Sequence, residues 1–316
     1  MARLYIVMAT YNGEKYLPQM LDSLVAQTRP ADKIIVVDDG SQDQTVNILE
    51  EYKKQLPIEI HKLSKNRGHL HAFSKGLEIA KSEVSDDDYI VLADQDDVWL
   101  PEKHCILIHA IESSEADLVL GDAQVIDGNG NLAANSWRKL NHIPDNLSLK
   151  AMMTGFTNVT GCMVIFKADL LDTILPVPAD VPVHDQWIAF CAAVRNGCVS
   201  INTPVIQYRI HTQNAIGLGH THTWSGNIKL NLQWAQALRH SKIFNQLPSE
   251  SQAFLNQFIN YCETRQHKLF LPTCLFWIIK NASSLYPHVH SKIAMIPRII
   301  FGTVGVPLAK KITGRN

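Results

Sequence analysis

The chain has 316 residues, of which 46% are hydrophobic and 19% are charged. This length and apolar fraction suffice for about two domains with a sizeable core, and they exclude a mainly disordered or fibrous chain. The net charge of −1 gives no indication of nucleic-acid binding, but the charge is unevenly divided. Residues 1–221 hold 18 basic and 28 acidic side chains, a net charge of −10, and residues 222–316 hold 11 basic and 2 acidic ones, a net charge of +9. The sequence therefore predicts an acidic body joined to a basic C-terminal region.

Cysteine usage and the apolar segments indicate the compartment. The six cysteines form no C-x-x-C pair and mostly lie in apolar runs, so we expect buried free thiols in a reducing environment. The apolar stretch at the N-terminus is too short for a signal peptide, and we interpret it as a first strand. No segment reaches the ~18–20 uninterrupted apolar residues that span a bilayer. We expect a cytoplasmic protein, either free or peripheral on the inner face of the cell membrane.

The first 125 residues alternate between strand-like and helix-like patterns. Continuous apolar runs are typical of strands buried on both faces, and apolar residues at 3.6-residue spacing are typical of helices. The expected strands are Leu4–Ala9, Lys33–Val37, Ile58–Leu63 and Tyr89–Ala93, and the expected helices are Glu14–Ala26, Asp43–Tyr52 and His69–Ala80. This alternation predicts an α/β fold with a mostly parallel sheet and helices on both faces.

Residues 117–215 are less regular, and the pattern becomes helical, amphipathic and basic from residue 224 onward. The elements expected in the irregular part are a strand at Asp117–Val125, a turn at 127–130, an alternating segment at Thr160–Lys167, a helix at Asp185–Arg195 and closing strands at Val199–Ile201 and Val205–Ile210. We therefore predict a catalytic domain over residues 1–215 and a helical basic region over residues 222–316.

Polar clusters follow three of the predicted strands. Residues 10–13 read Thr-Tyr-Asn-Gly, residues 38–41 read Asp-Asp-Gly-Ser, and residues 94–97 read Asp-Gln-Asp-Asp. Ligands of open parallel sheets bind at the carboxyl ends of the strands, so we expect one shared site. No G-x-G-x-x-G follows the first strand and no P-loop motif occurs, which removes the main sequence support for a dinucleotide-binding domain or a P-loop ATPase.

The cluster at residues 94–97 carries the strongest chemical signal. Its three carboxylates repel one another unless a cation neutralises them, and oxygen ligands suit Mg²⁺ or Mn²⁺, ions that usually also bind substrate phosphates. The alternative is an acidic loop at the start of a helix. Asp38 and Asp39 have two readings as well: they could bind a base and a ribose, or they could form only a turn and a helix cap.

These motifs resemble those of a known family. The segments Met8–Glu14, Ile34–Ser41, Asn66–Gly68 and Ala93–Trp99 stand in the order found in the inverting family 2 glycosyltransferases with the GT-A fold. The resemblance covers residues 3–215, and the form Asp-Gln-Asp-Asp-Val-Trp most resembles the bacterial rhamnosyltransferase-like branch, which builds surface polysaccharides such as lipopolysaccharide. It implies a Rossmann-like nucleotide-binding sheet and sugar transfer with inversion.

The resemblance also assigns roles to residues by matching position. Asp96 is expected to contact the metal, with Asp97 as its rival. The nucleotide-sugar would be bound by Thr10, Tyr11, Glu14, Asp38, Asp39, Asn66, Arg67, Asp94 and Gln95.

Two later segments complete the expected site. Residues 183–187 resemble the segment that supplies the catalytic base, which makes Asp185 the candidate, although many relatives have Glu-Asp where this chain has His-Asp. Residues 208–211 resemble the late motif whose histidine, here His211, can complete the metal site. Asp185 could instead only cap a helix, and His211 could be an ordinary hydrogen-bonded histidine. Trp99 and Trp187 could stack on a sugar or pack in the core.

The expected reaction is metal-dependent transfer of a sugar from a nucleotide diphosphate to a saccharide or lipid-linked acceptor. The resemblance suggests thymidine-diphosphate rhamnose as donor, with a uridine-diphosphate hexose as the alternative. A nucleotidyltransferase that makes sugar nucleotides is a rival, but it should have a basic glycine-rich loop after the first strand. A non-catalytic carbohydrate-binding or scaffold module is a second rival. The acceptor, the linkage and the oligomeric state, including a homodimer, stay open.

The basic region has no motif with an assignable role. Residues 293–309 are very apolar and are flanked by Lys292, Lys310 and Lys311. Basic amphipathic segments of this kind can lie on an anionic membrane. A helical hairpin packed on the body and a dimer contact are the alternatives.

Overall fold

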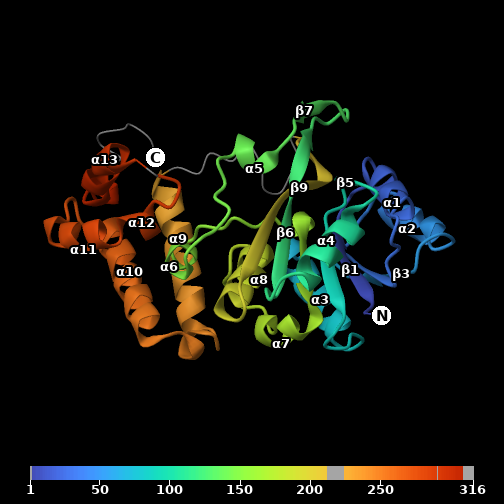
Figure 1. Cartoon of the computed structure of the whole chain (residues 1–316), viewed down its shortest axis with the longest axis horizontal. Coiled ribbons are helices and arrows are strands. Elements are labelled where there is room, and N and C mark those ends of the chain that lie inside the picture. The colour runs from blue at the N-terminus through green and yellow to red at the C-terminus, as the bar shows by residue number, and fades with distance from the viewer. Residues whose placement is uncertain (1, 212–223, 290, 309–316) are drawn as a thin grey trace. The chain divides into compact units, whose positions relative to one another are not determined.

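The computed structural model describes residues 2–211, 224–289 and 291–308, and the chain divides into two compact units (Figure 1). The first unit comprises residues 1–141, 159–177 and 183–215, and the second comprises residues 142–158, 178–182 and 216–316. Two short internal segments thus join the C-terminal helices, a division that differs from a single boundary near residue 215.

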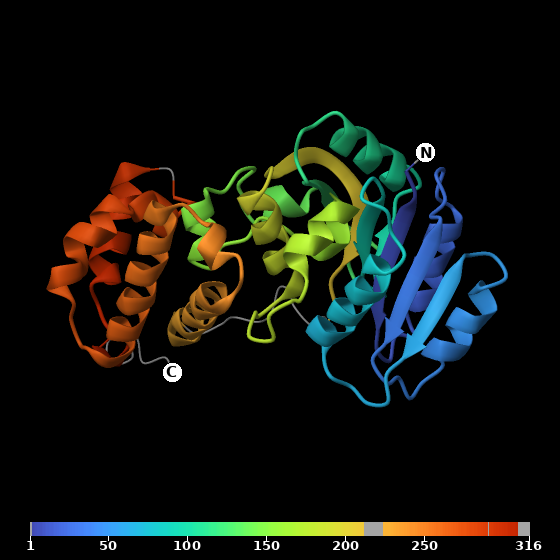
Figure 2. The same ribbon diagram turned by 90° about the horizontal axis from the view of Figure 1, so that it is seen from below.

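The first unit is built on one sheet with the strand order β3-β2-β1-β4-β8-β6-β9-β5, and β7 pairs with β6. Its strands are β1 Leu4–Thr10, β2 Lys33–Asp38, β3 Ile58–Lys62, β4 Tyr89–Ala93, β5 Val98–Trp99, β6 Leu118–Ile126, β7 Leu132–Ala134, β8 Val164–Lys167 and β9 Cys198–Arg209. The first four strands pair in parallel, as does β6 with β9, and β8 runs antiparallel between β4 and β6. Figure 2 shows the parallel strands of the N-terminal half side by side.

Helices cover both faces of this sheet. Helices α1 Leu17–Val25, α2 Thr45–Tyr52 and α4 Lys103–Glu112 share a buried apolar cluster with the face that carries Ile6 and Met8. Helix α3 His69–Lys81 packs on the opposite face, where a Cβ at Gly76 would lie 2.5 Å from Val7 Cγ1. The remaining helices of the unit are α5 Trp137–Leu140, α7 Leu171–Ile174 and α8 His184–Val194. The predicted α/β class with helices on both faces is confirmed.

Local chemistry explains where elements differ from expectation. Helix α1 starts at Leu17 instead of Glu14, because the carbonyl of Gly13 accepts the N–H groups of Tyr16 and Leu17 and closes a turn first. The two strands expected after residue 198 form the single strand β9, and irregular register against β6 accommodates Pro204, which lacks an N–H. Strands β5 and β7 are too short to produce a periodic pattern.

The second unit is helical, as predicted for the C-terminal region. Its helices are α6 Leu149–Met153, α9 Trp224–His240, α10 Ser249–His267, α11 Leu275–Lys280, α12 Ala282–Leu285 and α13 Lys292–Gly302. Helices α9 and α10 lie side by side (Figure 1), and the indole N–H of Trp234 donates to the carbonyl of Met152 at 2.8 Å. Over the described ranges, no helix combines the length and the hydropathy that crossing a bilayer requires.

Candidate active site

Three polar turns meet at one edge of the sheet. Strands β1, β2 and β4 are parallel neighbours, with Thr10 opposite Asp38 and Met8 opposite Ala93. The turn of residues 94–97 follows Ala93 directly, and β5 begins at Val98. The three clusters therefore lie at one edge of the sheet, and their use as one shared ligand site stays a prediction.

Asp38 is a buried carboxylate that fixes the turn after β2. It is 1% exposed and accepts hydrogen bonds from the hydroxyl of Thr10 at 2.9 Å and from the hydroxyl and N–H of Ser41 at 2.6 and 2.9 Å. Thr10 and Asp38, two of the residues predicted to bind the nucleotide-sugar, are thus hydrogen-bonded to each other. Their contact with a ligand stays a prediction.

Asp39 joins this turn to the segment before α3. Its two carboxylate oxygens accept the N–H groups of Arg67 and Gly68 at 2.8 and 2.7 Å. Asn66 Oδ1 also accepts the N–H of Gly68, at 3.1 Å, and the side chains of Asn66 and Arg67 are exposed. The structure therefore brings residues 66 and 67 to the edge where a nucleotide is expected.

The side chain of Gln95 ties the turn after β4 to the turn after β1. Its amide accepts the N–H of Tyr11 at 2.9 Å and donates to the carbonyl of Tyr11 at 3.0 Å. A Cβ at Gly13 would lie 2.3 Å from Gln95 Oε1, so this approach requires glycine. The ring of Tyr11 stays 42% exposed, whereas the carboxylate of Glu14 accepts the N–H of Gln44 at 3.0 Å, just before α2. Gln95 thus fixes the turn after β1 against the turn after β4, and Glu14 fixes the segment before α2.

Asp96 and His211 face each other. His211 Nε2 lies 2.9 Å from Asp96 Oδ2, and the imidazole packs against Tyr16 with ring centroids 4.8 Å apart. Buried Arg209 fixes the end of β9 in place, since its N–H donates to Asp97 Oδ1 at 3.1 Å and its Nε to the carbonyl of Asp96 at 2.8 Å. The late segment therefore reaches the acidic turn, as the resemblance implies.

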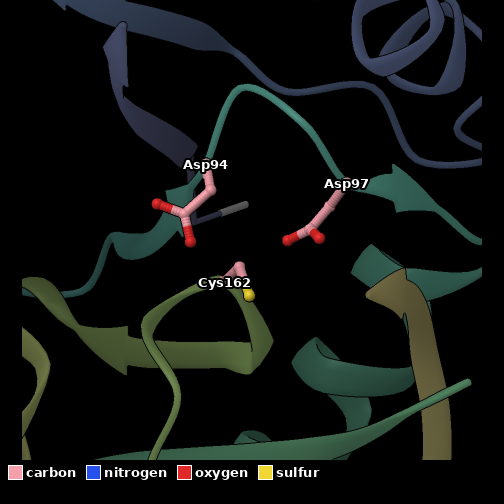
Figure 3. Close-up of side chains that lie close together, drawn as sticks. All are labelled: Asp94, Asp97 and Cys162. Carbon is pink, nitrogen blue, oxygen red and sulfur yellow. The ribbon is translucent and has the colours of Figure 1, made fainter. Parts of the chain in front are cut away.

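A second group lies deeper, formed by Asp94, Asp97 and Cys162, whose possible ligand atoms lie within 4.8 Å of one another (Figure 3). Burial raises the pKa of Asp94 to about 7 and holds the pKa of Asp97 well above its usual value. Burial also raises the pKa of the Cys162 thiol and lowers the pKa of Lys103 to about 7. Lys103 Nζ donates to the carbonyl of Cys162 at 2.6 Å and lies 3.2 Å from the centre of the Trp99 ring.

These two groups differ in their fitness for Mg²⁺ or Mn²⁺. Asp96 and His211 offer a carboxylate oxygen and an imidazole nitrogen, and their side chains are 17% and 11% exposed. Such donors suit Mn²⁺, and a cation held there would replace the direct contact between the two side chains. The deeper group offers a protonated thiol and the 1% exposed Asp97, which already accepts an N–H. The donor chemistry therefore favours Asp96 with His211.

Asp185 lies in the first turn of α8, close to this edge. Val183 occupies the cap position, so Asp185 is not the helix cap. Its Oδ2 accepts the N–H of Gly161 at 3.1 Å, and its charge contributes to the raised pKa of Asp94. Burial raises the pKa of Asp185 to about 6. A carboxylate of this kind is ionised at neutral pH and a stronger base than an exposed one.

Three further side chains around the site are buried, those of His184, Trp99 and Trp187. His184 is buried, stacks on Phe73 with centroids 3.9 Å apart, and has its pKa lowered to about 3 by burial, so it is neutral. Trp99 is 2% exposed, and Trp187 is fully buried with its indole N–H donating to the carbonyl of Ile174 at 2.8 Å. Of the two readings given for these rings, packing in the core agrees with their burial, and stacking on a sugar does not.

The sequence analysis missed Lys103, Arg209 and the position of Cys162 at the site. Arg209 lies within the late motif that located His211, so its neighbourhood could have been foreseen. Lys103 gives no such signal, because a lysine in the first turn of a helix normally predicts a solvated charge.

The chain is similar in sequence to known glycosyltransferases. Residues 5–175 match the model of the family described as "Glycosyl transferase family 2". One curated relative is the dTDP-rhamnosyl transferase RfbG of Shigella flexneri, 28% identical over 221 residues that cover 66% of this chain. This alignment covers 73% of the length of RfbG, and the alignments with two other curated relatives cover 66% and 80% of their lengths.

Two solved structures show the same fold. A fragment of S. aureus TarS in complex with UDP-GlcNAc has a TM-score of 0.58 and 16% identity, over 96% of this chain and 84% of that one. The mannosyltransferase PcManGT of Pyrobaculum calidifontis, in complex with GDP-Man and Mn²⁺, has a TM-score of 0.54 and 18% identity, over 99% and 79%. These likenesses confirm the expected GT-A type of sheet. Since the family model covers more than half of the sequence, this chain belongs to glycosyl transferase family 2.

Proposed function

We propose that the protein transfers a sugar from a nucleotide diphosphate to a hydroxyl group of a saccharide or lipid-linked acceptor, with inversion, in the synthesis of a bacterial surface polysaccharide. The observation that carries this proposal is the meeting of Asp96 with His211 at the sheet edge to which Asp185 also belongs. The donor atoms of Asp96 and His211 suit a cation, and the carboxylate of Asp185 suits a general base. Membership of glycosyl transferase family 2 favours transfer over a nucleotidyltransferase or a scaffold module.

Asp96 and His211 would hold a divalent cation, Mg²⁺ or Mn²⁺. When bound, the ion neutralises charge on the diphosphate, which makes the nucleotide a better leaving group. The Mn²⁺ complex of PcManGT supports this assignment. Arg209 Nε holds the backbone carbonyl of Asp96, and the N–H of Arg209 holds the carboxylate of Asp97. The role of Arg209 in this proposal is to position Asp96 opposite His211.

Asp185 would act as the general base. It takes the proton from the acceptor hydroxyl while that oxygen bonds to the anomeric carbon, and the bond from this carbon to the diphosphate oxygen breaks. A single displacement of this kind inverts the configuration. Its pKa of about 6 suits this task, because the group is ionised near pH 7 and yet basic enough to accept a proton.

The nucleotide would lie over the turns after β1 and β2. The exposed ring of Tyr11 and the exposed side chains of Asn66 and Arg67 are available for the base, ribose or phosphates. Thr10, Glu14, Asp38 and Gln95 would shape this pocket, whereas Asp39 would position residues 67 and 68.

The donor can be identified with purified protein. RfbG points to thymidine-diphosphate rhamnose, and the TarS and PcManGT complexes make UDP-GlcNAc and GDP-Man the alternatives to include. A panel of nucleotide sugars is screened with and without Mn²⁺ for thermal stabilisation, where a donor at about 100 times its Kd should add ~2.7 kcal/mol to the free energy of unfolding. Turnover should release a nucleoside diphosphate. Release of pyrophosphate would show a nucleotidyltransferase, and binding of free sugars with no turnover would show a binding module.

A further inference from the structure

Among the described residues of the second unit, eight large apolar side chains are exposed, and exposed apolar side chains that lie together can mark an interaction surface. The most exposed are Phe276 at 79% and Ile293 at 81%. We call the set the apolar surface; its members are Leu269, Phe270, Leu275, Phe276, Ile279, Ile293, Ile296 and Ile300.

The segments that carry the apolar surface pack against one another. Helices α11 and α13 are in contact, and both belong to the same group of helices in Figure 1. The segment before α11 is tied to the end of α13, since Phe270 bridges to Val304 and the N–H of Gly305 donates to the carbonyl of Leu269 at 3.0 Å. The exposed residues therefore come from one packed substructure.

Buried and half-buried polar side chains hold α13 in this orientation. The hydroxyls of Tyr286 and Tyr261 donate to the carbonyls of Arg298 and Gly302, each at 2.9 Å, and Arg265 Nη2 donates to the carbonyl of Phe301 at 2.9 Å. With its backbone fixed in this way, the helix leaves Ile293, Ile296 and Ile300 outside. These residues follow the i, i+3, i+7 spacing of one helix face, which is the pattern that normally packs into a core.

The charge around the apolar surface indicates what covers it. No Asp or Glu follows Glu263 in the sequence, whereas eight Lys and Arg residues do. Three of the lysines adjoin apolar-surface residues in the chain and are exposed: Lys268, Lys280 and Lys292. Lys310 and Lys311, named in the sequence analysis, lie outside the described residues. Apolar side chains flanked by cations match an anionic lipid surface, whereas the same surface of a second copy of the chain would bring like charges together.

We propose that the apolar surface and its neighbouring lysines bind peripherally to the surface of an anionic lipid bilayer. This proposal is independent of the sugar-transfer reaction. In it, Phe276, Ile293, Ile296 and Ile300 enter the boundary between headgroups and acyl chains, and the lysines contact the headgroups.

The test is co-sedimentation of the full chain with vesicles of phosphatidylcholine alone and of phosphatidylcholine mixed with phosphatidylglycerol. We expect binding to the anionic vesicles, weakened about fivefold for each of Lys268, Lys280 and Lys292 changed to Gln. The double variant Phe276→Glu, Ile293→Glu should bind at least about tenfold more weakly. Leu132→Glu is the matched control, because Leu132 is also exposed but lies on β7 in the first unit, and it should bind like the unchanged protein.

Several outcomes would overturn the proposal. The first is that the unchanged protein does not bind anionic vesicles, and the second is that the double variant binds them as strongly as the unchanged protein does. The third is self-association, seen by light scattering, that the double variant abolishes, because this result would identify a second copy of the chain as the partner. Thermal melts of each variant show whether it is folded. Transfer to a soluble acceptor, measured in parallel, should be unchanged in the double variant, so failure of membrane binding is distinguishable from failure of the proposed reaction.

Discussion

At the residue scale, burial separates acidic groups that look equivalent in the sequence. Asp94, Asp97 and Asp185 are held where ionisation is costly, and their pKa values are raised. Asp96 instead lies beside His211 at the less buried side of the turn. The motif could predict that these residues share a site, but it could not distinguish their environments, because desolvation depends on the packing of β9 and α8 around them.

Asp185→Asn should reduce the transfer rate by about 10²- to 10⁴-fold, the usual contribution of a general base. Donor binding should change little, since an amide oxygen can still accept the N–H of Gly161. Asp87→Asn is the control, an exposed aspartate in the loop before β4. Steady-state kinetics with a saturating donor make the comparison. A rate that stays within twofold would remove Asp185 from the reaction.

The pH dependence of transfer follows from the same residue. Burial raises the pKa of Asp185 from 3.8 to about 6, so the basic form is lost as the pH falls through about 6. The rate in the unchanged protein should therefore rise with pH and level off above this value. In Asp185→Asn this rise should be absent from the residual rate. A rising limb that persists in the variant would assign it to another group.

Removal of either proposed metal ligand should weaken the response to Mn²⁺. Asp96→Asn and His211→Gln should each raise the Mn²⁺ concentration for half-maximal activity by at least about tenfold, since even loss of an outer partner of a ligand costs that much. Titration of transfer activity with Mn²⁺ measures the effect. Cys162→Ser is the comparison for the deeper group, and a larger shift in this variant than in the other two would favour that group as the metal site.

At the element scale, strands and helices with long periodic patterns were predictable, whereas short or long-range features were not. β1, β2, β4 and α3 follow from apolar runs and helical spacing alone. β5 has two residues and forms only because it pairs with β9, which is more than a hundred residues away in the chain. The link between the turns after β1 and β4 likewise depends on one side chain, that of Gln95.

This link can be tested by a double-mutant cycle. Gly13→Ala should displace the Gln95 amide and lose its two hydrogen bonds to Tyr11, at a cost of about 1–3 kcal/mol in the free energy of unfolding. Gln95→Ala loses the same two bonds and should cost a similar amount. With Gln95→Ala already present, adding Gly13→Ala should cost little, because the clash is gone. Urea unfolding of the four proteins measures these values, and simple additivity would contradict the proposed contact.

At the scale of the whole molecule, the sequence shows the contrast in charge but not the composition of the units. The basic region was visible from its 11 basic and 2 acidic residues. The sequence did not show that the second unit also includes residues 142–158 and 178–182. For residues 142–158 the contacts are long-range: the indole N–H of Trp234 donates to the carbonyl of Met152, and Lys150 pairs with Glu250. Such contacts leave no periodic signal in the local sequence.

The central claim is that Asp96 and His211 hold the cation that serves the diphosphate of the donor. Anomalous diffraction at the manganese edge, from crystals grown with Mn²⁺ and a nucleoside diphosphate, tests it most directly. We predict one strong peak bonded to Asp96, His211 and phosphate oxygens. A peak bonded to Asp94, Asp97 and Cys162 instead, or a diphosphate bound at this edge with no manganese beside it, would contradict the account.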